Sequence, residues 1–337
     1  MAHAGVRILT RSSDMAVVGL TEVFRRIHTI IKASARLKSI LRNRRPDLLI
    51  LIDYPDFNIH IAGVAKRYNI PVLYYISPQI WAWRSGRVRK IARRVDRMAV
   101  ILPFEKEFYS KRGVQVDYVG HPLLDICPDS MNKKQARFDL DVGNNYPVVG
   151  ILPGSRKEEI RNLLPAMVES VRILNRRYAD MQCLLPLAQT ISPEFVQPFI
   201  EGTGLNLKVF SGDNIYNILS ACDIAVVTSG TATLETAIMG VPMVVIYKGS
   251  KLSYMIVKRM VKVSHISLAN LVAGEEVVPE LIQDAVTPEG IAKKMFIMLE
   301  DRDTRENIVK KLGRIRGLLG EGGASERTAK IALDMMG

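Results

Sequence analysis

The segment DIAVVTSGTATLETAIMGVPMVV, residues 223–245, decides the fold of this chain. One apolar run ends at Thr228, a helical stretch opens at Gly230, and Gly240 ends it before a second apolar run. Glycine suits the left-handed position just past a helix, and Pro242 then starts the next strand. The pattern predicts strand, helix and strand, with both strands buried on both faces of a parallel sheet.

The same alternation extends outward through the whole chain. Amphipathic stretches such as residues 17–41 separate the short apolar runs, and the tail from Pro288 onward has a helical pattern. Repeated strand–helix–strand units predict an α/β fold with doubly wound parallel sheets. We expect strands at residues 48–52, 72–76, 98–102, 117–120, 148–152, 182–185, 224–228 and 243–247.

Length and composition predict a globular protein of two domains. The chain has 337 residues, of which 48% are hydrophobic and 24% charged, so it is neither disordered nor fibrous. The polar stretch at residues 128–146 separates two series of strands. We therefore expect one Rossmann-like domain at residues 1–135 and a second at residues 136–337. The C-terminal helices are expected to pack back on the first domain.

Other global features narrow the chemistry only a little. Cys127, Cys183 and Cys222 match no metal or redox spacing. No apolar segment is long enough to span a bilayer, and the first residues contain no signal-peptide core. The formal net charge of +13 attracts anions. Charge alone leaves phosphates, nucleic acid and an anionic membrane open as partners.

One strand-to-helix turn in the second half has the composition of an anion site. In VVGILPGSRKEEI, residues 148–160, Gly154 lets the backbone approach a ligand. Ser155, the permanently charged Arg156 and the free amides of the helix start supply donors. The spacing is not that of a P-loop. The alternative is a tight turn in which Ser155 only caps the helix.

A second such turn lies in SGTATLE, residues 229–235. Its hydroxyls and amides suit a diphosphate, because the helix dipole favours negative charge at this end. Glu235 either accepts hydrogen bonds from ribose hydroxyls or is a partner of the helix dipole. Two such turns in one half favour the phosphate hypothesis over either turn alone. The candidate ligands are Ser229, Gly230, Thr231, Thr233 and Glu235.

A carboxylate follows the first predicted strand. In PDLLILIDYPDFNIHIAG, Asp53 stands at the carboxyl edge of the sheet, where open α/β folds bind ligands. It is either a general base for a hydroxyl or a strand-end turn residue. Asp56 fits a helix N-cap, and Asn58 either caps the helix or contacts a ligand. Asp53 and Asp56 offer too few oxygen ligands for a hard cation, so no metal is expected.

A basic segment with both tryptophans follows the second predicted strand. In YYISPQIWAWRSGRVRKIARRVDR, residues 74–97, Val88 and Ile91 line the inner side of a helix whose other sides are basic. Trp81, Trp83 and Arg84 precede that helix. Aromatic and basic residues together fit an anionic membrane or a lipid phosphate, a nucleic-acid patch, or a solvated face.

Two further polar residues are candidate contacts. His121 follows Gly120 at a strand end, close to the expected domain boundary, and Asn270 lies in the segment SLANLVAG. No Ser-His-Asp spacing and no pair of metal ligands is recognisable.

Taken together, these segments resemble the lipid-A-disaccharide synthase family of inverting GT-B glycosyltransferases. The resemblance covers most of the chain, and its Ser-Pro-x-x-Trp-Ala-Trp-Arg segment is highly specific. The matching motifs are IDYPDFN (52–58), YYISPQIWAWRSGRVRKI (74–91), LPFEKEFY (102–109), YVGHPLLD (118–125), LPGSRKEEI (152–160), SGTATLE (229–235) and SLANLVAG (267–274).

The resemblance implies transfer of 2,3-diacylglucosamine from its UDP donor to 2,3-diacylglucosamine 1-phosphate (lipid X) through a β-1,6 linkage. Asp53 would be the base, while Arg156 and residues 229–231 would stabilise the departing UDP without a metal or cofactor. Glu235 and Asn270 would contact the ribose and substrate. Asn58, Trp81, Trp83, Arg84 and His121 would lie on the acceptor and membrane side.

The same resemblance implies a cytoplasmic protein, peripheral on the inner face of the inner membrane. It implies no nucleic acid and allows a homodimer. Members of the family begin with a strand and a Gly-rich loop ahead of the segment matched here by residues 15–23, so we expect a first domain incomplete at its N-terminus. The alternatives are a UDP-sugar epimerase of the same fold and an inactive truncated fragment that binds UDP or membrane.

Overall fold

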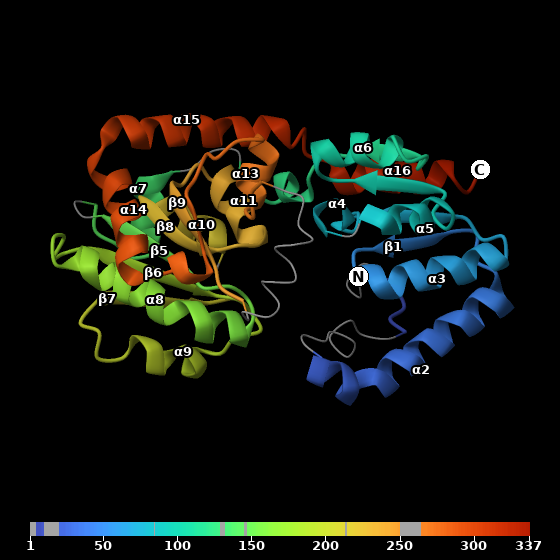
Figure 1. The fold of residues 1–337 in the computed structure, drawn as a ribbon, viewed down its shortest axis with the longest axis horizontal. Helices are drawn as coiled ribbons and strands as arrows, with labels where there is room; N and C mark the ends of the chain where they lie inside the picture. The colour runs from blue at the N-terminus through green and yellow to red at the C-terminus, as the bar shows by residue number, and fades with distance from the viewer. Residues whose placement is uncertain are drawn as a thin grey trace.

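The chain forms two lobes, each built around one parallel sheet (Figure 1). The coordinates are a computed structural model, which describes residues 5–9, 20–83, 85–128, 132–144, 147–212, 214–249 and 264–337. Both sheets are covered by helices, so the predicted α/β class with doubly wound parallel sheets is confirmed.

The first sheet has the strand order β1-β2-β3-β4, and neighbouring strands are parallel. Its four strands lie within two residues of the predicted ranges. They are β1 (Leu49–Ile52), β2 (Val72–Tyr75), β3 (Arg97–Val100) and β4 (Val116–Tyr118).

Helices from distant parts of the chain cover the two faces of this sheet. Val72 and Tyr74 of β2 point into a cluster with residues of α3 and α5, whereas Leu73 and Tyr75 point into a cluster with residues of α16. Alternate strand residues are therefore buried on opposite faces. The helical segments before the second lobe are α2 (Leu20–Arg44), α3 (Pro55–Arg67), α4 (Ile80–Trp83), η2 (Ser85–Arg87), α5 (Val88–Ala92), α6 (Pro103–Ser110) and η3 (Pro122–Asp125).

The second sheet has six parallel strands in the order β10-β9-β8-β5-β6-β7. Four of them were predicted; β7 and β10 were missed, because β7 carries polar residues at Asn206, Lys208 and Ser211 and β10 has three residues. The strands are β5 (Val148–Leu152), β6 (Gln182–Leu187), β7 (Asn206–Ser211), β8 (Ile224–Thr228), β9 (Met243–Tyr247) and β10 (Glu280–Ile282).

The strand order reverses at β5. The chain runs from β5 outward to β6 and β7, and then returns to the other side of β5 with β8. Ligands of open α/β sheets bind outside the carboxyl ends of the strands at such a switch point. The helical segments of this part are α7 (Lys133–Asp139), α8 (Lys157–Asn175), α9 (Pro193–Ile200), α10 (Ile215–Ala221), α11 (Thr231–Ile238), α13 (Leu268–Ala273), η4 (Gln283–Ala285), α14 (Pro288–Glu300), α15 (Arg302–Leu318) and α16 (Ala324–Asp334).

The C-terminal helices divide between the lobes. α15 packs on α11 and α13 of the second lobe, and the chain then crosses so that α16 lies against the first (Figure 1). Ala324 and Ile331 of α16 share a buried cluster with Leu73 and Val119. The expected division at residue 135 falls inside α7. We propose instead that the second domain runs from α7 through α15 and that α16 belongs to the first.

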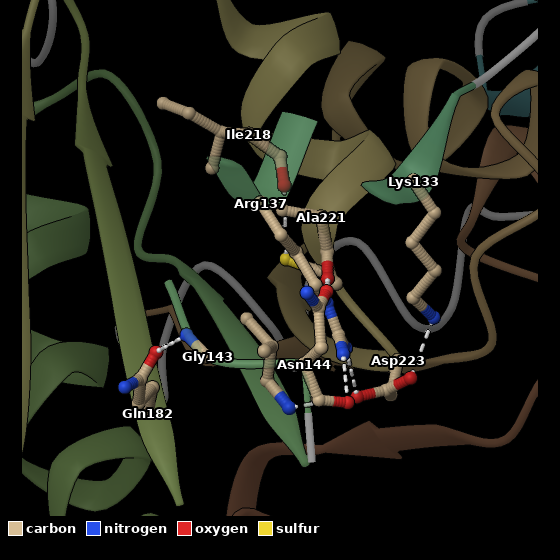
Figure 2. A network of polar contacts seen from close by, with 10 residues as sticks. Lys133, Arg137, Gly143, Asn144, Gln182, Ile218, Ala221 and Asp223 are labelled. Atoms are coloured by element: carbon tan, nitrogen blue, oxygen red, sulfur yellow. Dashed lines mark hydrogen bonds and ion pairs between the residues drawn. The ribbon is translucent and has the colours of Figure 1, made fainter. Parts of the chain in front are cut away.

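A polar network ties α7 to the second sheet at the amino ends of its strands (Figure 2). Asp223, just before β8, accepts hydrogen bonds from Arg137 Nη2 at 2.6 Å, Lys133 Nζ at 2.5 Å and the Val148 amide at 2.8 Å. Arg137 also donates to the Ala221 carbonyl oxygen at 3.0 Å. The side chain of Arg137 is only 6% exposed, so its charge depends on these partners.

Removing the carboxylate at this network should destabilise the second lobe. In Asp223→Ala the Arg137 guanidinium would stay buried without its charge partner. We expect a loss of about 3 kcal/mol in the free energy of unfolding, the lower end for a broken buried pair, because the Asp223 side chain is itself 23% exposed. Asp141→Asn removes a carboxylate that pairs with Lys208 at the surface and should change stability little. Denaturant unfolding of both variants makes the comparison. Equal effects would contradict a supporting role for Asp223.

Candidate nucleotide and transfer site

The two predicted anion-binding turns meet at the switch point of the second sheet. One follows β5 and the other follows β8, which are neighbouring strands. Together they line a cavity of about 410 Å³ that contains Gly154, Ser155 and Arg156 from the first turn. Ser229, Gly230 and Thr231 from the second turn line the same cavity. Separate stretches of sequence thus supply one site.

The turn after β5 is fixed by its glycine and by a threonine. Gly154 has φ of 101°, a left-handed value that other residues rarely adopt. A Cβ at this position would lie 2.5 Å from Oε2 of Glu159. Thr190 lies just after β6, and its Oγ1 donates a hydrogen bond of 2.8 Å to the Ser155 carbonyl oxygen. α8 then begins at Lys157, with Arg156 as its N-cap residue.

The donors of this turn already contact a carboxylate. Glu159 Oε1 accepts from Arg156 Nη1 at 3.0 Å, and Glu159 Oε2 accepts from the Ser155 amide at 3.2 Å. The Arg156 side chain is 60% exposed. Sequence reasoning missed Glu159, because a carboxylate in the first turn of a helix is also the ordinary partner of the helix dipole.

The turn after β8 leads into α11, and its residues line the cavity. Ser229 Oγ donates to the Ile266 carbonyl oxygen at 2.9 Å, and the Ser229 amide donates to Ile246 at 2.9 Å. A Cβ on Gly230 would have no atom within 4 Å, so space lies beside this residue. Thr231 is exposed at the helix start. Thr233 is fully buried, and its Oγ1 donates to the Gly230 carbonyl oxygen at 2.8 Å, so it braces the turn.

Glu235 lies half-buried in the cavity wall, one turn into α11. Tyr216 donates its hydroxyl to Glu235 Oε1 at 3.2 Å. Burial raises the pKa of Glu235, while the Tyr216 hydrogen bond lowers it. One carboxylate oxygen keeps its acceptor capacity for a hydroxyl group.

Apolar side chains form part of the cavity lining, here called the apolar wall. It comprises Leu187 from β6, Phe210 from β7 and Ile215 at the start of α10. Sequence reasoning missed these residues, since β7 itself was not predicted. Hydrogen-bond donors together with apolar side chains in one cavity suit a ligand with a phosphate end and a flat ring.

Asp53 lies at the carboxyl edge of the first sheet in a strained turn. Asp53 and Tyr54 both have φ of 47°, which is uncommon outside glycine. The Asp53 carbonyl oxygen accepts from the Tyr74 hydroxyl at 2.6 Å and from Asn58 Nδ2 at 2.6 Å. Asn58 Nδ2 also donates to Ile52 at 3.0 Å. The side chain of Asn58 is therefore engaged in holding this turn.

The Asp53 carboxyl group is exposed, and the second-sheet cavity is lined without it. Within the described part of the chain, no hydrogen bond of the Asp53 carboxylate is recorded. A turn held through its backbone with the carboxylate outward is a geometry that suits proton transfer to or from a bound group.

The tryptophan segment is anchored inward. Trp81 is 8% exposed, donates from Nε1 to Glu105 Oε1 at 3.0 Å and packs edge-on against Phe104. Glu105 is 1% exposed and also accepts from Ser77 Oγ at 2.5 Å. Burial raises the pKa of Glu105, and these hydrogen bonds oppose the shift. Trp83 ends α4, and Arg84 lies outside the described residues.

His121 and Asn270 are both buried and hydrogen-bonded within the chain. Nδ1 of His121 accepts from the Leu123 amide at 3.2 Å, and its own amide donates to Leu319 at 3.1 Å. Nδ2 of Asn270 donates to the Val278 carbonyl oxygen and to Glu280 Oε1, both at 2.9 Å. The predicted substrate contacts of these residues stay predictions; in the described structure they hold loops.

The described residues contain neither a metal-binding cluster nor a membrane-spanning helix. No group of three or more His, Cys, Asp or Glu side chains there is arranged to hold a metal ion. Among the same residues, no helix is both long enough and apolar enough to cross a bilayer.

Two parallel-sheet lobes, with an anion-ready cavity at the switch point of the second, define an α/β protein of the GT-B class. The chain belongs to the lipid-A-disaccharide synthase family, since the family model described as lipid-A-disaccharide synthetase matches residues 1–333. This membership makes it a hexosyltransferase of lipid A biosynthesis.

Full-length relatives support the same assignment. The lipid-A-disaccharide synthase of Geobacter metallireducens is 50% identical over 337 residues, covering 100% of this chain and 88% of that protein. The Geobacter sulfurreducens enzyme of the same name is 48% identical over 339 residues, again covering 100% and 88%.

Solved structures support the fold. A UDP-GlcNAc 2-epimerase from Neisseria meningitidis bound to UDP-GlcNAc aligns with a TM-score of 0.64 at 14% identity, over 94% of this chain and 84% of that one. A glycosyltransferase from Rickettsia africae aligns with a TM-score of 0.56 at 14% identity, over 95% and 84%. At such identity the epimerases are relatives in fold alone, so the epimerase alternative has no support beyond the fold.

The buried imidazole at the lobe junction should make stability depend on pH. Burial lowers the pKa of His121 to about 4, so the unfolded chain binds this proton first as the pH falls. Stability contributed by neutral His121 is full above about pH 6.5 and is lost down to about pH 4, by at most about 3 kcal/mol. His121→Asn keeps an acceptor for the Leu123 amide. The unfolding free energy of the variant, measured from pH 7 to 4, should fall less than that of the wild type; parallel curves would contradict the assignment.

Proposed function

We propose that this chain transfers 2,3-diacylglucosamine from UDP-2,3-diacylglucosamine to 2,3-diacylglucosamine 1-phosphate (lipid X), forming a β-1,6 linkage and releasing UDP. The observation that carries the proposal is the convergence of two anion-binding turns on one cavity in a chain of this family. The Neisseria meningitidis epimerase, which shares the fold, is bound to UDP-GlcNAc and so supports a UDP-sugar as the ligand class.

In this proposal the second lobe stabilises the leaving group. The Arg156 guanidinium and the amides at Ser155 and Thr231 donate to the diphosphate as negative charge develops on UDP. Their partial and full positive charges lie at two helix starts, where anions are favoured. Glu235 accepts from a ribose hydroxyl, and the apolar wall with Phe210 receives the nucleobase.

The first lobe supplies the base. Asp53 takes the proton of the acceptor hydroxyl while its oxygen attacks the anomeric carbon from the face opposite UDP, which inverts that centre. Tyr74 and Asn58 hold the backbone of the Asp53 turn, so the carboxylate is positioned before the substrate binds. Trp83, Arg84 and His121 stay predicted residues of the acceptor side.

A transfer assay with acylated donor and acceptor tests this function through Asp53→Asn. Asparagine tolerates left-handed φ, so the turn should persist. Because general-base catalysis contributes roughly 10²–10⁴-fold, kcat should fall at least about 100-fold. The Kd for UDP should change less than about twofold, since Asp53 lies outside the second-lobe cavity.

Asp47→Asn is the matched control, with the same charge change in an exposed residue just before β1. Full turnover in Asp53→Asn would remove Asp53 as the base. If the wild type binds UDP but forms no disaccharide and releases no UDP from the donor, the inactive UDP-binding alternative would be favoured.

We also propose that the first lobe docks on an anionic membrane, at the inner face of the inner membrane, where acylated substrates reside. Three cations of the predicted basic helix are used internally: Arg87 pairs with Asp56, Arg94 donates to Ile59 at 2.9 Å, and Arg97 pairs with Asp117. Arg89, Lys90 and Arg93 are exposed. The docking surface is therefore narrower than the sequence indicated.

Nearby residues extend this surface onto α2 and α3. Burial lowers the pKa of His60, and the charges of Lys38, Arg94, Lys90 and Arg67 lower it further, so positive potential gathers here. Ile31 is 57% exposed on the adjoining face of α2. Cations beside exposed apolar side chains are the composition of a peripheral membrane surface. A homodimer stays a prediction.

Vesicle binding tests the membrane proposal. The protein should bind phosphatidylglycerol vesicles more tightly than phosphatidylcholine vesicles, and salt should weaken the binding. Arg89→Glu with Lys90→Glu should lower vesicle affinity at least about tenfold, since each surface cation contributes roughly 1 kcal/mol. Lys293→Glu with Lys294→Glu on α14 makes the same charge change elsewhere and should retain binding. If both double variants lost vesicle affinity equally, the net charge of the protein would explain the binding and the proposed docking surface would be wrong.

A further inference from the structure

Glu159 holds the donors that the proposed function assigns to the diphosphate. It stands in the first turn of α8, and its side chain lines the cavity. Both of its carboxylate oxygens are engaged, one by the Arg156 guanidinium and the other by the Ser155 amide. No other carboxylate of the described residues contacts both groups.

The backbone is shaped to admit this contact. Any side chain at residue 154 would place its Cβ 2.5 Å from Glu159 Oε2, closer than a non-bonded pair can approach. Gly154 therefore lets the carboxylate lie directly against the turn. The same absence of a side chain is what a phosphate oxygen would need to reach the Ser155 amide.

The single amide hydrogen of Ser155 cannot be donated fully to two anions at once, whereas the Arg156 guanidinium has further N–H groups. A diphosphate oxygen that hydrogen-bonds Ser155 and Arg156 meets the charge of Glu159 at contact range, and like charges there repel. The Arg156–Glu159 contact is an i,i+3 pair whose arginine is 60% exposed, which makes it a weak ion pair. A ligand with the charge of a diphosphate can displace it.

We propose that Glu159 is an internal competitor for the diphosphate, which limits the affinity for UDP and thereby speeds its release after transfer. This inference rests on the proposed function and deepens it, because it assigns Glu159 a role in the affinity for UDP and in its release. As UDP leaves, the Glu159 carboxylate returns to the exposed Ser155 amide and Arg156 guanidinium, so these donors regain a hydrogen-bond acceptor. The alternative is that Glu159 only holds the turn in shape. In that case its removal should weaken UDP binding instead of strengthening it.

Calorimetric titration of the full chain with UDP separates the two roles. Glu159→Gln keeps the shape and an acceptor oxygen for Ser155 but removes the charge, and should lower the Kd for UDP about tenfold. Glu158→Gln removes an equal charge from the neighbouring exposed residue and should change the Kd less than about twofold. Arg156→Ala should raise the Kd for UDP, because it removes the shared donor.

The transfer assay gives a second readout. Product inhibition by UDP should strengthen in Glu159→Gln, and kcat should fall if UDP release then limits turnover. Unchanged or weaker UDP binding in Glu159→Gln, with its melting temperature retained, would overturn the inference and make Glu159 a positioning residue. Failure of the proposed function looks different: the wild-type chain would then form no disaccharide in the transfer assay, and if it also bound no UDP the inference would fall with the proposed function.

Discussion

The position of β5 between β6 and β8 is the constraint on which the site depends. Because the chain leaves β5 in one direction and returns on its other side, the turns after β5 and β8 lie next to each other with a crevice between them. Gly150 makes this pairing tight: a Cβ there would lie 3.1 Å from Cys222 Sγ and 3.3 Å from Ala225 Cβ. Two helix starts are thereby brought to one edge.

That arrangement separates residues that reach the cavity from residues that hold it. Ser155, Arg156 and Thr231 are exposed at the two turns. Thr233 and Asn270, which the motifs also single out, are fully buried and hydrogen-bonded to backbone. Buried polar groups are costly unless paired, so a short polar side chain near a turn is often taken up by the turn itself. A motif therefore indicates where a site lies, and the burial of each residue then shows whether it can contact a ligand or only supports the turn.

The sequence predicted what periodicity and local chemistry determine. Apolar runs gave eight of the ten described strands within a few residues, and the two glycine turns were found before their meeting was known. The left-handed φ of Asp53 was not predictable, because it is maintained by the Tyr74 hydroxyl, 21 residues away. Similarly, the inward direction of Trp81 depends on the buried carboxylate of Glu105, which belongs to another motif. Partners brought together by the fold carry no local signal.

The net charge of the chain is positive, but the charged side chains that line the cavity are mostly acidic. The chain has a formal net charge of +13, whereas the described lining of the cavity includes the carboxylates of Glu159 and Glu235 beside one guanidinium, that of Arg156. In the proposed function, anion recognition would therefore come from directed donors at two helix starts rather than from a general positive field. Where donors are already hydrogen-bonded to a carboxylate, the net free energy of binding a ligand is the difference between their interaction with the ligand and their interaction with that carboxylate. If Glu159 competes as proposed, weaker binding of UDP would speed product release, a step that limits kcat in many enzymes.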